Sequence, residues 1–260
     1  MGAERGGRID RARWPHLARG RTVVAASTNY IEQVFDSAAT LANALAQSVA
    51  DDLRRGLSAR NTAVLALSGG TTPREFLREL SQQALDWSRV TVTLVDERWV
   101  GPDDERSNAR LLRENLLKNR ATNALFVPLY CDAPDPETGL PRIAARIAAL
   151  PLPFDAVVLG LGEDGHTASF FPGGDHLAHA LDVHGTAQVL SMRAPDAGEP
   201  RITLSMPTVL NARAVYLHIQ GDKKRAVLAQ VVAAQGALAT SPMRVVLDHA
   251  TSPIQVFWCA

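Results

Sequence analysis

The sequence has few cysteines and aromatic residues, no excess of either charge and no long apolar run. Its only two cysteines, Cys131 and Cys259, exclude a disulfide framework and a four-cysteine zinc site. Lys+Arg and Asp+Glu are equal at 27 each, which argues against a general attraction for nucleic acid or for an anionic membrane. Any anionic ligand must therefore be bound by a few local cations and backbone amides.

The amino-terminal residues carry no targeting signal. No apolar run reaches the roughly 18 residues that a membrane-spanning helix needs. The start has no apolar signal core, and Gly6 stands where a myristoylation motif requires Ser or Thr. We therefore expect a cytoplasmic protein. Residues 1–20 are rich in Arg and Gly without periodicity, and we interpret them as a flexible arm before a single α/β domain over residues 21–260.

Apolar strand-like runs alternate with helix-like stretches along the rest of the chain. The runs are continuous, which predicts strands covered on both faces and joined by right-handed helical crossovers. We therefore expect an α/β fold with a three-layer, mostly parallel, Rossmann-like sheet and helices on both faces. The expected strands cover residues 22–26, 63–67, 90–95, 126–130, 154–161, 214–219 and 254–258. The expected helices cover residues 31–57, 73–83, 108–118 and 225–234, and residues 134–141 are expected to form a loop.

Polar segments follow four of the expected strands, at the edge where a parallel sheet binds its ligands. The first is a glycine turn before a helix, which Thr72 is expected to cap and Pro73 to open. Glycines let backbone amides approach a ligand, and these amides together with the positive helix end favour a phosphate. A plain strand-to-helix turn would use the same residue types. The predicted phosphate-binding residues are Ser68, Gly69, Gly70, Thr71 and Thr72.

The second strand end carries three charged residues, Asp96, Glu97 and Arg98. A solvated loop is the plain interpretation of such a run. Alternatively, Arg98 binds a phosphate or carboxylate while an acidic neighbour holds its guanidinium group. The nearby Ser107-Asn108 pair is typical of a helix cap, and we interpret it as structural.

The third segment, residues 160–167, matches the G-x-G-x-x-G pattern of dinucleotide-binding proteins. Its two acidic residues would face and repel a pyrophosphate, so we expect no nicotinamide cofactor. A tight glycine loop that holds Asp164 and His166 at the rim of the sheet fits better. Histidine titrates near neutral pH and can take a proton from water when a carboxylate orients it. Asp164 and His166 are therefore the predicted catalytic residues, against the alternative of an ordinary loop histidine.

Two lysines, Lys223 and Lys224, begin the helix after the fourth strand end. A cation is unfavourable at a helix start, which suggests that an anionic ligand lies nearby. The sequence does not decide which lysine faces a ligand, and a solvated pair is the plain alternative. His176, His179 and His184 follow no metal-site spacing, so we expect surface histidines and no metal.

Together and in this order, the segments resemble the glucosamine-6-phosphate isomerase/6-phosphogluconolactonase family, over essentially the whole chain after about residue 22. The sharpest matches are LALSGGTTP at 65–73, DER at 96–98 with SN at 107–108, and LGLGEDGHTAS at 159–169 followed by FPG at 171–173. Weaker matches are RITLS at 201–205 with Asn211, and the G-x-x-K that ends at Lys224.

The resemblance is to the lactonase side of this family. It implies hydrolysis of 6-phospho-glucono-δ-lactone to 6-phosphogluconate in the oxidative pentose phosphate pathway, with no metal or organic cofactor. It also implies that Arg98 and Lys224, or Arg201 in place of one of them, neutralise the phosphate or the substrate's other polar end, with Asp96 in the same binding set. The implied partner is a small phosphosugar lactone, with no nucleic acid and no membrane. A monomer and a small homo-oligomer both stay open.

Two other functions stay open as well. The deaminases of the same family usually have Asn-Glu-Pro-Gly where this chain has Phe-Phe-Pro-Gly at residues 170–173. They also have Asp-Glu-Tyr in place of the charged triplet at 96–98, and their reaction uses the additional carboxylate beside the histidine. The second alternative is a sugar-phosphate sensor without catalysis. Such sensors usually carry a DNA-binding domain, for which residues 1–20 are too short.

Overall fold

The computed structural model describes residues 21–24, 29–195 and 197–260, so the expected arm of residues 1–20 lies outside it. The strands are β1 (Arg21–Val24), β2 (Tyr30–Phe35), β3 (Ala63–Leu67), β4 (Val90–Leu94), β5 (Asp96–Arg98), β6 (Leu125–Val127), β7 (Ala156–Leu159), β8 (Val189–Met192), β9 (Arg201–Leu204), β10 (Val215–Gln220) and β11 (Ile254–Cys259). The α-helices are α1 (Ala38–Arg60), α2 (Arg74–Ser81), α3 (Asn108–Asn115), α4 (Pro136–Ala148), α5 (Leu177–Leu181), α6 (Met206–Leu210), α7 (Asp222–Val232) and α8 (Pro242–His249). None of these helices is long and apolar enough to cross a membrane.

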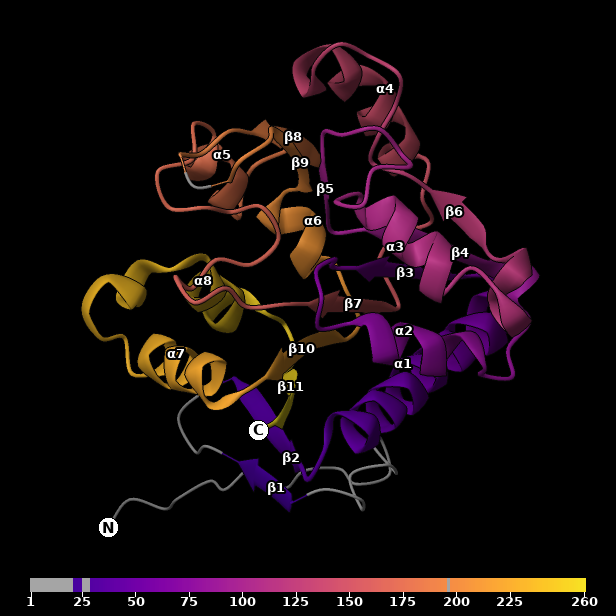
Figure 1. Cartoon of the computed structure of the whole chain (residues 1–260), viewed down its shortest axis with the longest axis horizontal. Coiled ribbons are helices and arrows are strands. Elements are labelled where there is room, and N and C mark those ends of the chain that lie inside the picture. The colour runs from indigo at the N-terminus through magenta and orange to yellow at the C-terminus, as the bar shows by residue number, and fades with distance from the viewer. Residues whose placement is uncertain (1–20, 25–28, 196) are drawn as a thin grey trace.

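The described strands form one large sheet and one small sheet (Figure 1). The large sheet has eight strands in the order β1-β2-β11-β10-β7-β3-β4-β6, and all its pairings from β2 to β6 are parallel. β1 joins the edge of this sheet in antiparallel pairing with β2. The small sheet, β5-β9-β8, is antiparallel. The expected α/β class with a mostly parallel sheet is confirmed.

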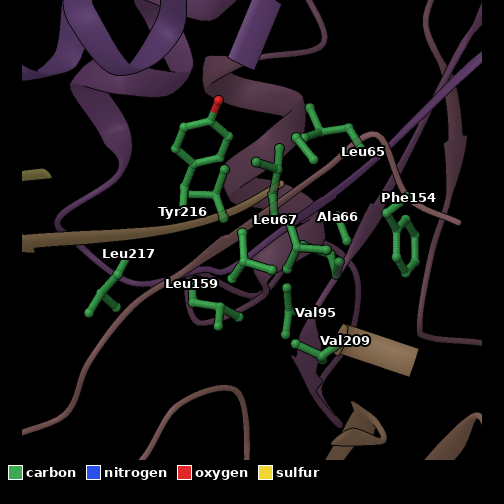
Figure 2. Close-up of a cluster of buried hydrophobic side chains, with 14 of the residues drawn as sticks. Leu65, Ala66, Leu67, Val95, Phe154, Leu159, Val209, Tyr216 and Leu217 are labelled. Carbon is green, nitrogen blue, oxygen red and sulfur yellow. The ribbon is translucent and has the colours of Figure 1, made fainter. Parts of the chain in front are cut away.

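Apolar strands buried on both faces form the core, as their continuous apolar runs predict. All five residues of β3 are buried. Tyr216 of β10 points to the face covered by α1, where its hydroxyl donates to the carboxylate of Asp52. Figure 2 shows Leu159 and Leu217 on the other side of these strands, toward Val209 of α6. The neighbouring strands therefore contribute to two apolar layers.

Burial of Asp52 should make the stability of the protein depend on pH. Burial is the main cause that raises the pKa of this carboxyl from 3.8 to about 6. A raised pKa stabilises the folded protein below pH 3.8, and this contribution is lost as the pH rises through about 6. The free energy of unfolding of Asp52→Asn minus that of the wild type should therefore be about 2–3 kcal/mol higher at pH 8 than at pH 4. Denaturant unfolding at both pH values measures this difference, and an equal effect at the two would contradict it.

The prediction of one helix over residues 31–57 is wrong at its beginning. Residues 30–35 form β2, which pairs in parallel with β11. The helix α1 starts only after Ser37, whose side chain forms a capping box with Thr40. The run Tyr-Ile-Glu-Gln-Val-Phe contains β-branched and aromatic residues that suit a strand. The predicted helix wrongly includes this run, which lies before the cap residue Ser37.

Other boundaries also differ from the predicted ones. Residues 134–141 are not a loop, because α4 begins at Pro136 after Asp135, whose carboxylate accepts the backbone N–H of Thr138 at 2.7 Å. The strand expected at 126–130 is β6, which is shorter and begins one residue earlier. The first expected strand is β1, and residues 25–26 of that prediction lie outside the described residues. The small sheet was not predicted at all.

Candidate functional site

A cavity of about 330 Å³ opens beyond the carboxyl ends of β3, β7 and β10. Residues from all four polar segments line it, so the structure brings together what the sequence placed at separate strand ends. From the predicted site, the lining includes Ser68, Gly69, Gly70, Thr71, Thr72, Asp96, Arg98, His166, Arg201 and Lys224. Asp164 is the one predicted site residue that is not part of this lining.

The glycine turn forms one wall of the cavity. Gly70 has a φ of +97°, which glycine adopts without strain, and a Cβ on Gly69 would lie 1.8 Å from the side-chain oxygen of Asn108. The hydroxyl of Ser68 is buried and has no hydrogen-bond partner among the described residues. The predicted cap is wrong: α2 begins at Arg74, Pro73 takes the cap position, and no side chain caps this helix. Thr72 is thus left to face the cavity.

The charged triplet forms β5 of the small sheet rather than a solvated loop. Asp96 is buried and accepts a hydrogen bond from the Ser169 hydroxyl at 2.5 Å. Glu97 is buried on another side, where it accepts the backbone N–H groups of Asn108 and Ala109 at the start of α3. Burial raises the pKa of Glu97. Asp96 therefore faces the cavity, whereas Glu97 holds α3 in place.

Two arginines lie side by side at the cavity, because Arg98 of β5 pairs in register with Arg201 of β9. Arg98 donates to the backbone carbonyl of Arg106 at 2.7 Å, so the prediction that an acidic neighbour holds its guanidinium group is wrong. Its Nε is buried and has no partner among the described residues. Arg201 donates to the carbonyl of Ala197 at 2.7 Å and packs on the ring of Phe171. Burial lowers the pKa of Arg201.

His166 and Asp164 form a hydrogen-bonded pair at the cavity rim. The Nδ1 atom of His166 lies 2.5 Å from a carboxylate oxygen of Asp164. This contact places the ring proton on Nδ1 and leaves Nε2 free to accept a proton. A Cβ on Gly162 would lie 2.2 Å from the histidine Nδ1, so glycine is required there for the pair to form. The ring of Phe171 packs against that of His166, with the two ring centroids 4.5 Å apart.

The two lysines of α7 have different surroundings. Lys224 is half-buried and lines the cavity, whereas Lys223 is exposed and does not. Within the described part of the chain, no carboxylate pairs with Lys224, so its charge is available to a ligand. Of the two lysines, Lys224 is therefore the one that faces the cavity.

The three histidines that were considered as a metal cluster, His176, His179 and His184, are exposed, as the sequence predicted. Among the described residues, no group of three His, Cys, Asp or Glu side chains has the arrangement of a metal site. Ser107 caps α3 through its side-chain oxygen, which confirms the structural interpretation of that residue.

Comparisons with known proteins identify the family of this chain. Residues 36–258 match the family model described as glucosamine-6-phosphate isomerases/6-phosphogluconolactonase. The chain belongs to this family. It is 49% identical to a 6-phosphogluconolactonase of Rhizobium meliloti over 86% of this chain and 97% of that one. It is 41% identical to a 6-phosphogluconolactonase of Pseudomonas aeruginosa over 87% and 93% of the two chains.

Solved structures of the family have the same fold. A 6-phosphogluconolactonase from Shewanella baltica superposes with a TM-score of 0.84 at 40% sequence identity, covering 88% of this chain and 97% of that one. A monomeric glucosamine-6-phosphate deaminase superposes with a TM-score of 0.70 at 18% identity, which shows the shared fold alone. Both branches of the family therefore use this architecture, and the side chains of the cavity must distinguish them.

The cavity of this family member also contains residues that sequence reasoning missed. His218 of β10 and Thr167 line it, and Ser169 holds Asp96. Thr167 and Ser169 belong to the quoted 159–169 segment, so their closeness to His166 in the sequence could have predicted them as site residues. His218 was counted as part of an apolar strand, although a histidine near the carboxyl end of a buried strand points to the ligand edge.

Proposed function

We propose that this protein hydrolyses 6-phospho-D-glucono-1,5-lactone to 6-phospho-D-gluconate, as the names of its relatives indicate for those proteins. The observation that carries the proposal is the His166–Asp164 pair, whose histidine lines the same cavity as the cationic side chains of Arg98, Arg201 and Lys224. A base for water and cations for an anionic substrate are what lactone hydrolysis needs. The reaction belongs to the oxidative pentose phosphate pathway.

The substrate phosphate would lie against the turn of residues 68–72, with Lys224 close by. The backbone amides of this turn, the unpartnered Ser68 hydroxyl and the unpaired lysine together favour an anion there. Arg98 and Arg201 would then hold oxygen atoms at the other end of the sugar, with Asp96 accepting from a sugar hydroxyl. This arrangement would place the lactone carbonyl near His166.

The chemistry follows from the geometry of the pair. His166 accepts a proton from water at Nε2 while Asp164 stabilises the imidazolium through Nδ1, and the water oxygen bonds to C1. Arg201, which packs on the same Phe171 ring as His166, would stabilise the tetrahedral oxyanion. When the intermediate collapses, the bond between C1 and the ring oxygen breaks, and the ring oxygen takes the proton from His166. Every step uses water and groups of this chain.

Arg98→Ala is expected to raise KM by about tenfold or more while kcat changes little. Its guanidinium group would bind the substrate equally in the ground state and the transition state, so its loss weakens binding without slowing the chemical step. Steady-state kinetics measures both constants, with Arg113→Ala, an exposed arginine of α3, as the matched control. A large fall in kcat at unchanged KM would contradict this role.

Deamination of glucosamine 6-phosphate is the second candidate, because the fold admits it. The position at which the deaminases have a carboxylate is Phe171 in this chain, and its ring packs directly on His166. An apolar ring there cannot move a proton during ring opening. This contact favours the lactonase over the deaminase.

We further propose that the protein acts in the cytoplasm on a freely diffusing phosphosugar lactone, as a monomer or small homo-oligomer. The balanced charge of the chain, with 27 cationic and 27 acidic residues, supports a small-molecule substrate rather than nucleic acid or a membrane surface.

The direct test generates the lactone in place by oxidation of glucose 6-phosphate and follows acid release with and without the protein. We expect acceleration with the phosphorylated lactone and far less with unphosphorylated glucono-1,5-lactone. Equal acceleration of both lactones would refute the phosphate-binding turn, and no acceleration of either would refute the proposed reaction.

A further inference from the structure

A buried histidine in the wall of the cavity has no part in the mechanism described above. His218 of β10 is 3% exposed, and it lines the cavity together with the glycine turn and Lys224. Its ring meets Phe76 of α2 edge to face, with the centroids 6.0 Å apart. The imidazole therefore lies between the sheet and the helix that follows the turn.

The hydrogen bonds of His218 leave one ring nitrogen without a partner. Its Nε2 lies 3.4 Å from the side-chain nitrogen of Gln220, which can only donate. Nε2 must therefore accept, and the proton of the neutral ring is on Nδ1. Nδ1 is buried and has no partner among the described residues. A buried N–H donor without an acceptor is unfavourable, so a ligand that supplies an acceptor would bind well here.

The surroundings of His218 indicate which acceptor fits. Burial and, second to it, the nearby charge of Lys224 lower the pKa of His218 to about 4, so the ring is neutral at physiological pH. The strand register pairs Leu217 with Leu159, which places His218 beside Gly160. A Cβ on Gly160 would meet nothing within 4 Å, so the space above this glycine is open. This open space belongs to the cavity that His218 and Lys224 also line.

We propose that His218 is a further phosphate-binding residue, whose Nδ1–H donates to a phosphate oxygen beside Lys224. Ser68, whose buried hydroxyl also has no partner among the described residues, would bind the same group from the turn. The proposal rests on the proposed function only for the identity of the phosphosugar. His218 is thus a specificity residue for the phosphate end of the substrate, and it takes no part in proton transfer at C1.

The test compares His218→Phe, which keeps the ring volume but has no donor, with His218→Asn, whose amide nitrogen can replace Nδ1. Calorimetric titration with inorganic phosphate and with 6-phosphogluconate gives the Kd for each variant. We expect His218→Phe to weaken both Kd values by about 10–100-fold and His218→Asn to restore most of the loss. Tyr216→Phe is the matched control, because it removes a polar group from the same strand and face at a site outside the cavity.

Kinetics supplies a readout that a merely structural role would not move. His218→Phe should raise KM for the phosphorylated lactone and leave both kcat and the hydrolysis of unphosphorylated glucono-1,5-lactone unchanged. Unchanged phosphate affinity in His218→Phe, or an equal loss of activity toward both lactones, would overturn the assignment. Failure of the wild-type protein to hydrolyse either lactone would instead refute the proposed function, and the phosphate titrations would still test His218.

Discussion

Replacing His166 by alanine is expected to lower kcat by about 10²–10⁴-fold, the contribution typical of a positioned general base. The expectation rests on the 2.5 Å contact between His166 Nδ1 and Asp164, which leaves Nε2 free to accept a proton from water. The affinity for 6-phosphogluconate should change little, because the turn of residues 68–72 and Lys224, which we propose to bind the phosphate, are untouched. Steady-state kinetics gives kcat, and calorimetry with the product gives the affinity.

Two variants sharpen the test of the base. His184→Ala removes an exposed histidine that does not line the cavity and should leave kcat unchanged. Asp164→Asn keeps the shape of the partner but removes its charge, so the imidazolium loses stabilisation and kcat should fall by less than in His166→Ala. Full activity of His166→Ala would show that another group activates the water.

Replacing Lys224 by alanine is expected to raise KM by about 10–100-fold, whereas replacing Lys223 should change it less than twofold. A hydrogen bond to a charged group contributes about 1.5–3 kcal/mol, which corresponds to this range of affinity. The two lysines are adjacent and carry the same charge, so the general electrostatic field is altered equally by either change. Only Lys224 lines the cavity.

A comparison of the phosphorylated with the unphosphorylated lactone shows whether the effect of each lysine depends on the substrate phosphate. The effect of Lys224→Ala should appear with the phosphorylated lactone and be absent with glucono-1,5-lactone. An equal rise of KM in the Lys223 and Lys224 variants would show that only the overall field matters. A fall in kcat without a rise in KM would assign Lys224 to the chemical step instead.

The location of the site could be predicted from the sequence because parallel strands end at one edge of a sheet. Four polar segments followed four apolar runs, and the structure brings them around one cavity. The proposed catalytic pair was predictable for a local reason, since two residues separated by one position in a glycine loop can reach each other. Asp164 and His166 do so.

The partners of the individual charges could not be predicted, because they depend on contacts distant in sequence. The plain interpretation of the sequence places Glu97 in a solvated run, yet it is buried against the start of α3, where it accepts two backbone N–H groups. Arg98 bonds to a carbonyl rather than to a carboxylate. Lys224 faces the cavity and Lys223 does not, because of the orientation of α7 on the sheet. The sequence at the start of a helix does not predict this orientation.

Short strands were the other elements that the sequence did not reveal. β5, β8 and β9 have three or four residues each, too few for a periodic pattern, and they form a sheet only with one another. This small sheet nevertheless pairs Arg98 with Arg201 and orients both toward the cavity. The side-by-side placement of these two arginines was therefore visible only in the structure.

The most direct test of the account measures both family reactions on the same preparation of the wild-type protein. Acid release from 6-phosphogluconolactone and ammonia release from glucosamine 6-phosphate are followed under the same conditions. The contact of Phe171 with His166, where the deaminases have a carboxylate, predicts rapid lactone hydrolysis and no ammonia release. Ammonia release without acceleration of lactone hydrolysis would contradict the account and assign the cavity to deamination.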